Sequence, residues 1–287
     1  MSVSAIQMSI TIVSPTNNSS SELQNAINRA QPGDTILALP GTYGPSASTG
    51  DQSMMVLVNT KGLLVKSAVA GGAILDAAMR CHSPIALGAN SAGFILDGFR
   101  LTRGLHAGFW SNSGGGQSVL IRNCEFCEIA RRTDSTTLGN AGIYTDATAD
   151  IRIENNRFWN IGRTNQAANS FDHSVYSHGR CRIRRNVFCN SVAGWHIQTA
   201  TGFSGEIEEN QFNGPNLFPD KSGQIMLWDQ CGSIVIRGNV FSGSRNTALT
   251  EYAFMSPSLV IEGNTVHGGS LGAPTGSITR GNRVIAL

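Results

Sequence analysis

The chain has few charged residues and no strong charge of either sign. Asp, Glu, Lys and Arg make up only 14% of the 287 residues, and the formal net charge is +2. Proteins that hold nucleic acid through its phosphates usually carry a strongly basic surface, so the composition argues against a nucleic-acid partner. Lysine is the scarcest cation, present only at Lys61, Lys66 and Lys221. The remaining cations are arginines, which favour bidentate contacts with carboxylates and therefore an acidic partner.

Two further features are missing. No stretch is apolar over the length that a membrane helix needs, and residues 1–15 lack the charged and apolar regions of a signal peptide. The CxxC motif at Cys124 and Cys127 has no second copy, so the six cysteines predict no zinc site. We expect buried free thiols, which favour a reducing compartment. Localisation stays open between cytoplasm, a phage particle and a chain whose signal has been removed.

Glycine is abundant, with 33 residues, and Asn and Ser are frequent, which predicts an all-β chain with many turns. One helix is predicted over about residues 19–31. Ser19 and Glu22 match a capping box, with Ser19 as N-cap. Apolar residues then follow at helical spacing, and Pro32-Gly33 ends the segment.

One motif recurs along the rest of the chain. Its order is an apolar residue, any residue, an apolar residue, two polar residues, an Asn, any residue and a final apolar residue. The Asn positions are Asn156, Asn186, Asn210, Asn239, Asn264 and Asn282, and an earlier imperfect copy has Cys124 there. The first five lie 24 to 30 residues apart, which is short for a propeller blade of roughly 40 residues and suits one turn of a coil of parallel strands.

The predicted fold is therefore an all-β solenoid. It has one domain over residues 1–287, with a capping helix at about 19–31 and stacked turns over 34–287. We expect the apolar residue at the end of each motif to stack inward. The Asn side chains are expected to hold an unusual backbone angle at a corner and to hydrogen-bond to one another.

A second strand per turn is predicted to carry two outward-facing columns, because strand side chains alternate between faces. The first column is Trp110, Tyr144, Tyr176, His196, Met226 and Thr250, and the second is Asn112, Asp146, His178, Gln198, Trp228 and Tyr252. Parallel strands stack about 4.8 Å apart, so these columns form a continuous surface. Aromatic faces pack on sugar rings and polar groups bind sugar hydroxyls, which predicts an extended polysaccharide as partner. The alternative is that loops cover this face and bury the aromatics.

The densest polar cluster is FDHSVYSHGR, at 171–180. Cleaving a uronic-acid chain by β-elimination needs a base, a group that neutralises the carboxylate and an acid. We predict His178 or His196 as base, Tyr176 as acid, and Arg180 or Asn112 beside the carboxylate. The predicted substrate-binding residues are Trp110, Asn112, Tyr144, Asp146, Asp172, His173, Gln198 and Trp228. The alternative for His173 and His178 is that they cap a turn.

Three segments resemble a known group. They are LQNAINRAQPGDTILALPGTY at 23–43, LLVKSAVAGGAILDA at 63–77 and FILDGFRLTRG at 94–104. They resemble the amino-terminal half of pectate-lyase-like proteins, in particular the alginate lyase and chondroitinase B group. The resemblance implies a right-handed parallel β-helix and a polysaccharide partner. It leaves a monomer and a tailspike-like homotrimer open, and it makes Ca²⁺ a candidate cofactor with Asp146, Asp172 and Asp229 as candidate ligands.

The chain departs from that group at the catalytic step. Where those relatives have a Lys base and an Arg on the next turn, this chain has Ser177-His178 and Gln198, so their lyase chemistry is not carried over. The pair Asp172-His173 resembles the Asp-Pro-His of mannuronan epimerases without its Pro.

Three functions therefore stay open. The first is a polysaccharide lyase or epimerase. The second is a glycoside hydrolase, which needs two carboxyl groups about 5 to 9.5 Å apart, with Asp146, Asp172, Asp229 and Glu251 as candidates. The third is a binding or structural solenoid without catalysis, such as a phage tail protein.

Overall fold

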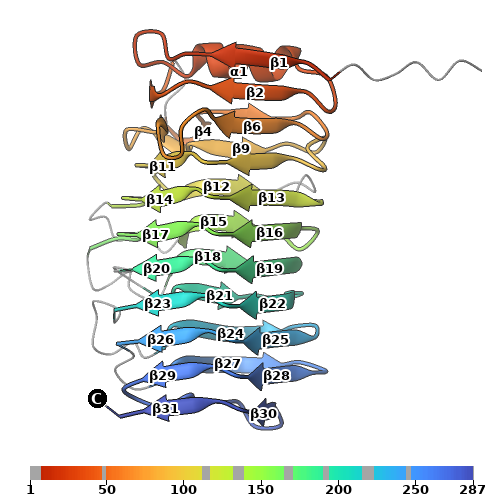
Figure 1. The fold of residues 1–287 in the computed structure, drawn as a ribbon, viewed down its shortest axis with the longest axis vertical. Helices are drawn as coiled ribbons and strands as arrows, with labels where there is room; N and C mark the ends of the chain where they lie inside the picture. Colours follow the sequence, from red (N-terminus) through yellow and green to blue (C-terminus); the bar gives the residue numbers. More distant parts are fainter. Residues whose placement is uncertain are drawn as a thin grey trace, which may run out of the picture.

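The strands of the protein stack into a long coil, from one end of the chain to the other (Figure 1). The computed structural model describes residues 8–46, 50–111, 117–131, 139–164, 171–189, 194–214, 223–243 and 247–286. In this part of the chain, every pair of named strands that shares a sheet ladder is parallel, and each complete turn adds one strand to each of three sheets. The predicted all-β solenoid is confirmed.

The largest sheet has eleven strands. In spatial order they are β1 (Ile10–Val13), β2 (Thr35–Ala38), β6 (Leu64–Ser67), β10 (Ile95–Asp97), β13 (Val119–Arg122), β16 (Asp150–Glu154), β19 (Arg180–Arg184), β22 (Ser204–Glu208), β25 (Ile234–Arg237), β28 (Leu259–Glu262) and β30 (Ile278–Arg280).

The second sheet has ten strands. They are β3 (Gly41–Tyr43), β7 (Ala73–Asp76), β11 (Arg100–Thr102), β14 (Glu125–Cys127), β17 (Arg157–Trp159), β20 (Val187–Cys189), β23 (Gln211–Asn213), β26 (Val240–Ser242), β29 (Thr265–His267) and β31 (Arg283–Ile285).

The third sheet has eight strands and forms the remaining side of the coil. They are β5 (Leu57–Val58), β9 (Ile85–Leu87), β12 (Ala107–Ser111), β15 (Asn140–Thr145), β18 (Asp172–Ser177), β21 (Ile197–Thr199), β24 (Ile225–Gln230) and β27 (Leu249–Met255). A separate pair is made by β4 (Gly50–Met54) and β8 (Cys81–Ser83).

The apolar residue that ends each motif is buried in the interior, as predicted, up to Val266; in the last turn Val284 is exposed. On the ten-stranded sheet the inward phenylalanines are in register and fully buried; they are Phe126, Phe158, Phe188, Phe212 and Phe241. Successive rings stack with centroids 4.8 to 4.9 Å apart. Strand spacing thus brings identical rings into contact along the axis, which stabilises the stack beyond the area it buries.

The predicted asparagine ladder is also present. Asn186 is typical: its Oδ1 accepts hydrogen bonds from the backbone N and the Nδ2 of Asn156, at 2.9 and 3.1 Å. Its Nδ2 donates to the carbonyl of Ile153 and to Oδ1 of Asn210, at 2.8 and 3.0 Å. The same bonds recur to Asn282, and the backbone N of Cys124 donates to Asn156 at the other end.

The unusual backbone angle at this corner belongs to the residue before each Asn. Asn155, Arg185 and Glu209 have φ between +53° and +56°, and Gly238, Gly263 and Gly281 have +63°. This corrects the expectation that the Asn itself holds the left-handed conformation. The Asn side chain instead satisfies the backbone groups that the sharp corner leaves unpaired.

Helix α1 (Ser21–Arg29) lies at the N-terminal end of the coil (Figure 1) and buries Leu23, Ala26 and Ile27 against the core. The predicted capping box is wrong. Ser20 is the N-cap and makes no side-chain capping bond, whereas Ser19 Oγ accepts from the backbone N of Ser21.

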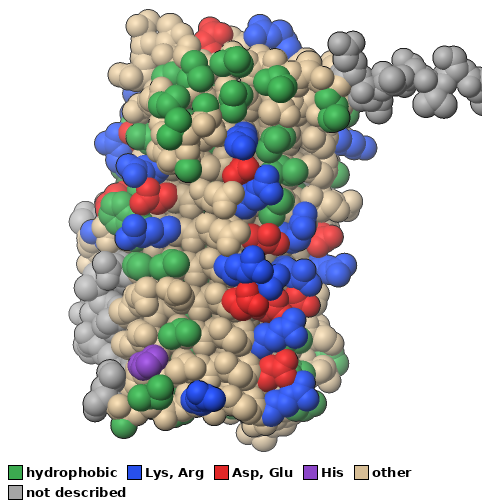
Figure 2. Space-filling view, viewed as in Figure 1, with side chains coloured by type: hydrophobic (Ala, Val, Ile, Leu, Met, Phe, Trp, Pro, Cys, Tyr) green, Lys and Arg blue, Asp and Glu red, His purple; other side chains and the backbone are tan. Residues whose placement is uncertain are grey.

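An alternating column of charge runs along the outside of the eleven-stranded sheet, and Figure 2 shows acidic and basic side chains gathered there. In register order its members are Lys66, Asp97, Arg122, Glu154, Arg184, Glu208, Arg237, Glu262 and Arg280. Opposite charges directly across a ladder are favourable. Ion pairs form at several rungs, including Arg122–Asp97 at 2.9 Å and Arg280–Glu262 at 2.5 Å.

Candidate functional site

An outward row of aromatic rings crosses the eight-stranded sheet. Trp110, Tyr144 and Tyr176 are in register on β12, β15 and β18, as the sequence predicts. The ring centroids of Trp110 and Tyr144 lie 4.0 Å apart, and those of Tyr144 and Tyr176 lie 5.6 Å apart, both stacked. Trp228 and Tyr252 form a further stacked pair at 4.6 Å. Trp228 and Tyr252 lie two residues further along their strands than Met226 and Thr250, which continue the column of Trp110, Tyr144 and Tyr176 after Gln198.

The structure corrects the register of the next strand. Gln198, not His196, pairs with Tyr176 and continues the column, and it is followed by Met226. His196 precedes β21 and is fully buried, with its ring 5.6 Å from that of Phe188. Burial lowers the pKa of His196 to about 3. The structure therefore does not bring His196 to the outer surface with Tyr176.

A cavity of about 770 Å³ covers this row of rings. Of the residues predicted to bind substrate or take part in catalysis, six line it: Trp110, Tyr144, His173, Tyr176, Gln198 and Trp228. The sequence interpretation did not assign Gln52, His82, His106, Asn140, Phe171 and Trp195, which line it as well. Asn112 lies outside the described residues. The alternative was that loops cover this face and bury the aromatics. It holds only in part, because Tyr144 and Tyr176 are half-buried.

His106 belongs to a chain of buried polar groups. Its Nδ1 lies 3.0 Å from Oδ1 of Asn140, whose Nδ2 donates to Oδ1 of Asp172 at 2.6 Å. A carboxylate only accepts, so Asp172 fixes the orientation of the Asn140 amide. Asn140 Oδ1 then accepts from His106, so the neutral imidazole carries its proton on Nδ1 and its lone pair on Nε2.

The far end of this chain is an ion pair without solvent exposure. Arg163 and Asp172 are both fully buried, with Arg163 Nη2 2.8 Å from Asp172 Oδ1 and Arg163 Nε 3.0 Å from Oδ2. The backbone N of Arg163 also donates to Oδ2, at 2.6 Å. Both carboxylate oxygens of Asp172 are therefore bonded within the protein and out of solvent, which contradicts its prediction as a substrate-binding residue. Its role is to hold Asn140, and through it His106.

Tyr176 and His178 carry the groups suited to proton transfer. Their rings lie 5.1 Å apart, edge to face. Burial, and next the proximity of Tyr144 and Asp229, raises the pKa of Tyr176, so its hydroxyl keeps its proton at neutral pH. His178 Nδ1 lies 3.1 Å from the carbonyl oxygen of Thr201, which can only accept. In the neutral ring Nδ1 is thus the donor, and Nε2 holds the lone pair.

His173 lines the cavity from beneath Tyr176. The two rings stack at 5.5 Å, and the other face of His173 stacks on Trp195 at 6.0 Å. Burial lowers the pKa of His173 to about 3, so this ring is neutral and the backbone N of Trp195 donates to its Nδ1 at 3.4 Å.

Known proteins share this architecture. The family described as "Right handed beta helix region" matches residues 141–282. The chain is a right-handed parallel β-helix.

Solved structures of the same fold extend over almost the whole chain. An alginate lyase from Paenibacillus sp. strain FPU-7 is 16% identical and covers 96% of this chain and 99% of its own, with a TM-score of 0.65. Pectate lyase Pel9A is 15% identical and covers 99% and 78%, with a TM-score of 0.67. The tailspike of E. coli bacteriophage HK620 is 12% identical and covers 95% and 64%, with a TM-score of 0.57. A comparison with curated proteins finds no match. At these identities the likeness establishes the fold.

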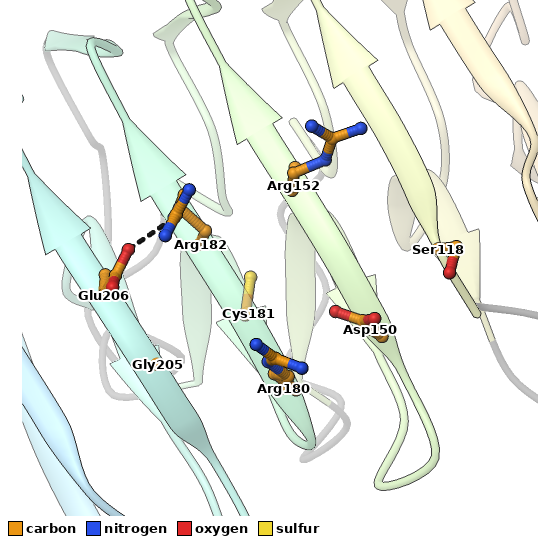
Figure 3. A pocket seen from close by; sticks show the side chains of 8 residues that line it. All are labelled: Ser118, Asp150, Arg152, Arg180, Cys181, Arg182, Gly205 and Glu206. Carbon is orange, nitrogen blue, oxygen red and sulfur yellow. Dashed lines mark ion pairs between the residues drawn. The ribbon is translucent and has the colours of Figure 1, made fainter.

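Arg180 lies on another side of this β-helix. It is the first residue of β19 in the eleven-stranded sheet, and it lines a separate hollow with Asp150, Arg152, Arg182 and Glu206 (Figure 3). The prediction that Arg180 stands beside Tyr176 to neutralise a carboxylate is therefore wrong. Only Gly179, with φ of +66°, separates Arg180 from His178, and the chain turns a corner there.

The candidate carboxylates are dispersed. Asp146 Oδ1 accepts from the backbone N and the hydroxyl of Thr148, at 3.1 and 2.8 Å, and thus shapes a turn. Asp229 Oδ2 accepts from the hydroxyl of Thr201 at 2.6 Å. Within the described ranges, no three His, Cys, Asp or Glu side chains are grouped as metal ligands. In that same part of the chain, no helix has both the length and the apolar character of a membrane span.

Proposed function

We propose that this β-helix binds an extended polysaccharide in the cavity of the eight-stranded sheet and cleaves an acidic one by β-elimination. The observation that carries the proposal is the row of stacked rings formed by Trp110, Tyr144 and Tyr176 within a cavity of about 770 Å³. Successive strands repeat about every 4.8 Å along this row. A chain of sugar rings lying along it would pack on one aromatic face after another.

The chemistry follows from two protonation states. In the neutral ring of His178 the lone pair is on Nε2, and Tyr176 keeps its phenolic proton because burial raises its pKa. In the proposed step, the base takes the proton from the carbon beside the substrate carboxylate. A carbon–carbon double bond forms, the glycosidic carbon–oxygen bond breaks, and the departing oxygen receives the proton of Tyr176. His178 is then protonated and Tyr176 ionised, and exchange with water resets both.

The substrate carboxylate needs a donor other than Arg180. Gln198 occupies the position beside Tyr176 in the register and lines the cavity. Its amide can donate to the developing negative charge, as a side-chain amide does in an oxyanion hole. Gln198 therefore takes the role beside the carboxylate that was predicted for Arg180. His178 remains as the base, because His196 is fully buried.

Hydrolysis is less well supported. It needs two carboxyl groups that face the substrate, and Asp172 is held by Arg163. Asp146, Asp229 and Glu251 are not among the residues that line the cavity. His178 does not line it either, but its ring contacts that of Tyr176, which does.

The test combines cleavage with binding. Polysaccharides are incubated with the protein, and two signals are recorded: the ultraviolet absorbance of unsaturated uronate ends and the appearance of reducing ends. We expect both signals to rise with one acidic polymer, and both to disappear in His178→Ala and Tyr176→Phe. Reducing ends without absorbance would overturn β-elimination in favour of hydrolysis.

Affinity electrophoresis in gels that contain the polymer tests the cavity itself. Trp110→Ala should abolish retardation, whereas Trp159→Ala should retain it because Trp159 lies on β17, outside the cavity. Retardation without cleavage would indicate a binding protein. Equal retardation of the two variants would overturn the proposed site.

A further inference from the structure

A second polar hollow, of about 330 Å³, lies on the outside of the eleven-stranded sheet. Three arginines line it: Arg152 on β16, and Arg180 and Arg182 on β19 (Figure 3). Arg152 and Arg182 are at one end of the hollow in this view and Arg180 is at the other. This hollow is separate from the aromatic cavity, which belongs to the eight-stranded sheet.

The arrangement breaks the charge pattern of this sheet. The neighbouring column alternates between positive and negative at every rung from Lys66 to Arg280. In the hollow, Arg152 and Arg182 instead stand directly in register, and Arg180 is two residues along the same strand. Like charges opposite each other on a sheet are destabilising. Stability of the bare sheet therefore does not explain the three arginines.

Their ion pairing is incomplete. Arg182 is paired with Glu206, which raises the pKa of Arg182. Arg152 and Arg180 form no ion pair with any described residue, although Asp150 is in register with Arg180. Three guanidinium groups thus face two carboxylates, and one of these is already used.

A glycine also lines the hollow. Gly205 on β22 has φ of +131°, and a Cβ there would collide with the carbonyl oxygen of Cys181. Only glycine therefore fits at this point of the close contact between β19 and β22. The volume of about 330 Å³ leaves room for a small ligand beside the guanidinium groups.

We propose that Arg152, Arg180 and Arg182 form an oxyanion-binding site. Guanidinium groups bind carboxylate, sulfate and phosphate oxygens in bidentate geometry, and a bound anion would relieve the repulsion between Arg152 and Arg182. Two sources fit this chemistry: a free inorganic anion, and an acidic group of a saccharide chain. The site does not depend on the function proposed for the aromatic cavity.

The test titrates the full chain with inorganic phosphate and, separately, with galacturonate, at constant ionic strength so that general screening does not change. Binding is followed by calorimetry and by the nitrogen-15 signals of the arginine Nε atoms. We expect saturable binding that shifts the Arg152 and Arg180 signals. The double variant Arg152→Gln/Arg180→Gln should weaken binding by about tenfold or more.

Two variants serve as controls. Arg157→Gln removes one positive charge from an exposed position on β17 and should leave the affinity unchanged. Arg180→Lys keeps the charge but loses the bidentate fork, and should lie between wild type and the double variant. Tighter binding of phosphate would assign the site to free anions, and tighter binding of galacturonate to a saccharide. Non-saturable titrations with both probes, or equal affinities of the double variant and Arg157→Gln, would overturn the proposal.

Discussion

Replacing Asn186 by alanine removes one member of the buried asparagine ladder. Four hydrogen bonds of the side chain are lost: two from Asn156 to Oδ1, and two from Nδ2 to Ile153 and Asn210. The backbone N of Asn156 and the carbonyl of Ile153 then stay buried without these partners. Each buried polar group left unpaired costs about 1–3 kcal/mol. We therefore expect the free energy of unfolding to fall by about 2–6 kcal/mol.

Asn282→Ala provides the matched comparison, because Asn282 makes the same kind of bonds at the last described rung. Its Nδ2 donates to the carbonyl of Ile261, and its Oδ1 accepts from Asn264. Asn282 is only part-buried, so water can replace these bonds. Urea unfolding, followed by circular dichroism and by tryptophan fluorescence, gives both free energies. If Asn186→Ala costs no more than Asn282→Ala, buried hydrogen bonding is not what makes the ladder stabilising.

Three further predictions concern the backbone, pH and catalysis. Gly263→Ala should lower the free energy of unfolding by about 1 kcal/mol, because φ is +63° and the new Cβ meets nothing within 4 Å; an unchanged melting curve would contradict this. The folded pKa of His196 is about 3, below the value of about 6.5 in the unfolded chain. The contribution of neutral His196 to the free energy of unfolding is therefore complete above about pH 6.5 and is lost at about 1.4 kcal/mol per pH unit as the pH falls. His173 adds an equal slope because its pKa is lowered likewise. His196→Gln should therefore halve the slope of unfolding free energy between about pH 6 and about pH 5 in urea titrations, and an unaltered slope would exclude this assignment. Tyr176→Phe should lower kcat about 10²-fold or more while the dissociation constant of the polymer stays within about threefold; a normal kcat would remove Tyr176 as the acid.

The sequence repeat predicted the fold because each repeated residue contacts its equivalents in the adjacent turns of the coil. An Asn or a Phe at a fixed place in each turn meets its own kind one strand away, so spacing along the sequence fixes contacts along the axis. The left-handed residue before each Asn was not predicted, because Asn155, Arg185 and Glu209 share no residue type that marks a positive φ.

The candidate site was only partly predictable. His196 was assigned to the outer column because Gly194 and Trp195 imitate the small and apolar residues that begin the other strands. In the structure, Ile197 takes the inward position between Val175 and Ile225, which suits the aliphatic column better than an indole. His82 and His106 lie in turns without the Asn motif, so no repeat fixed which way they face. The bond from Asn140 to Asp172 joins residues 32 apart, which the sequence alone does not reveal.

The three sheets make unequal contributions to stability. Stacked phenylalanines fill the inner face of the ten-stranded sheet, and opposite charges alternate along most of the eleven-stranded one. The eight-stranded sheet instead has Arg163 and Asp172 bonded to each other out of water, near two histidines that burial keeps neutral. Buried ion pairs add little net stability, and buried neutral histidines lose it as the pH falls. A fold stabilised on its other two sides tolerates these groups, and one of them, His173, lines the aromatic cavity, where a binding or catalytic task would favour such a group.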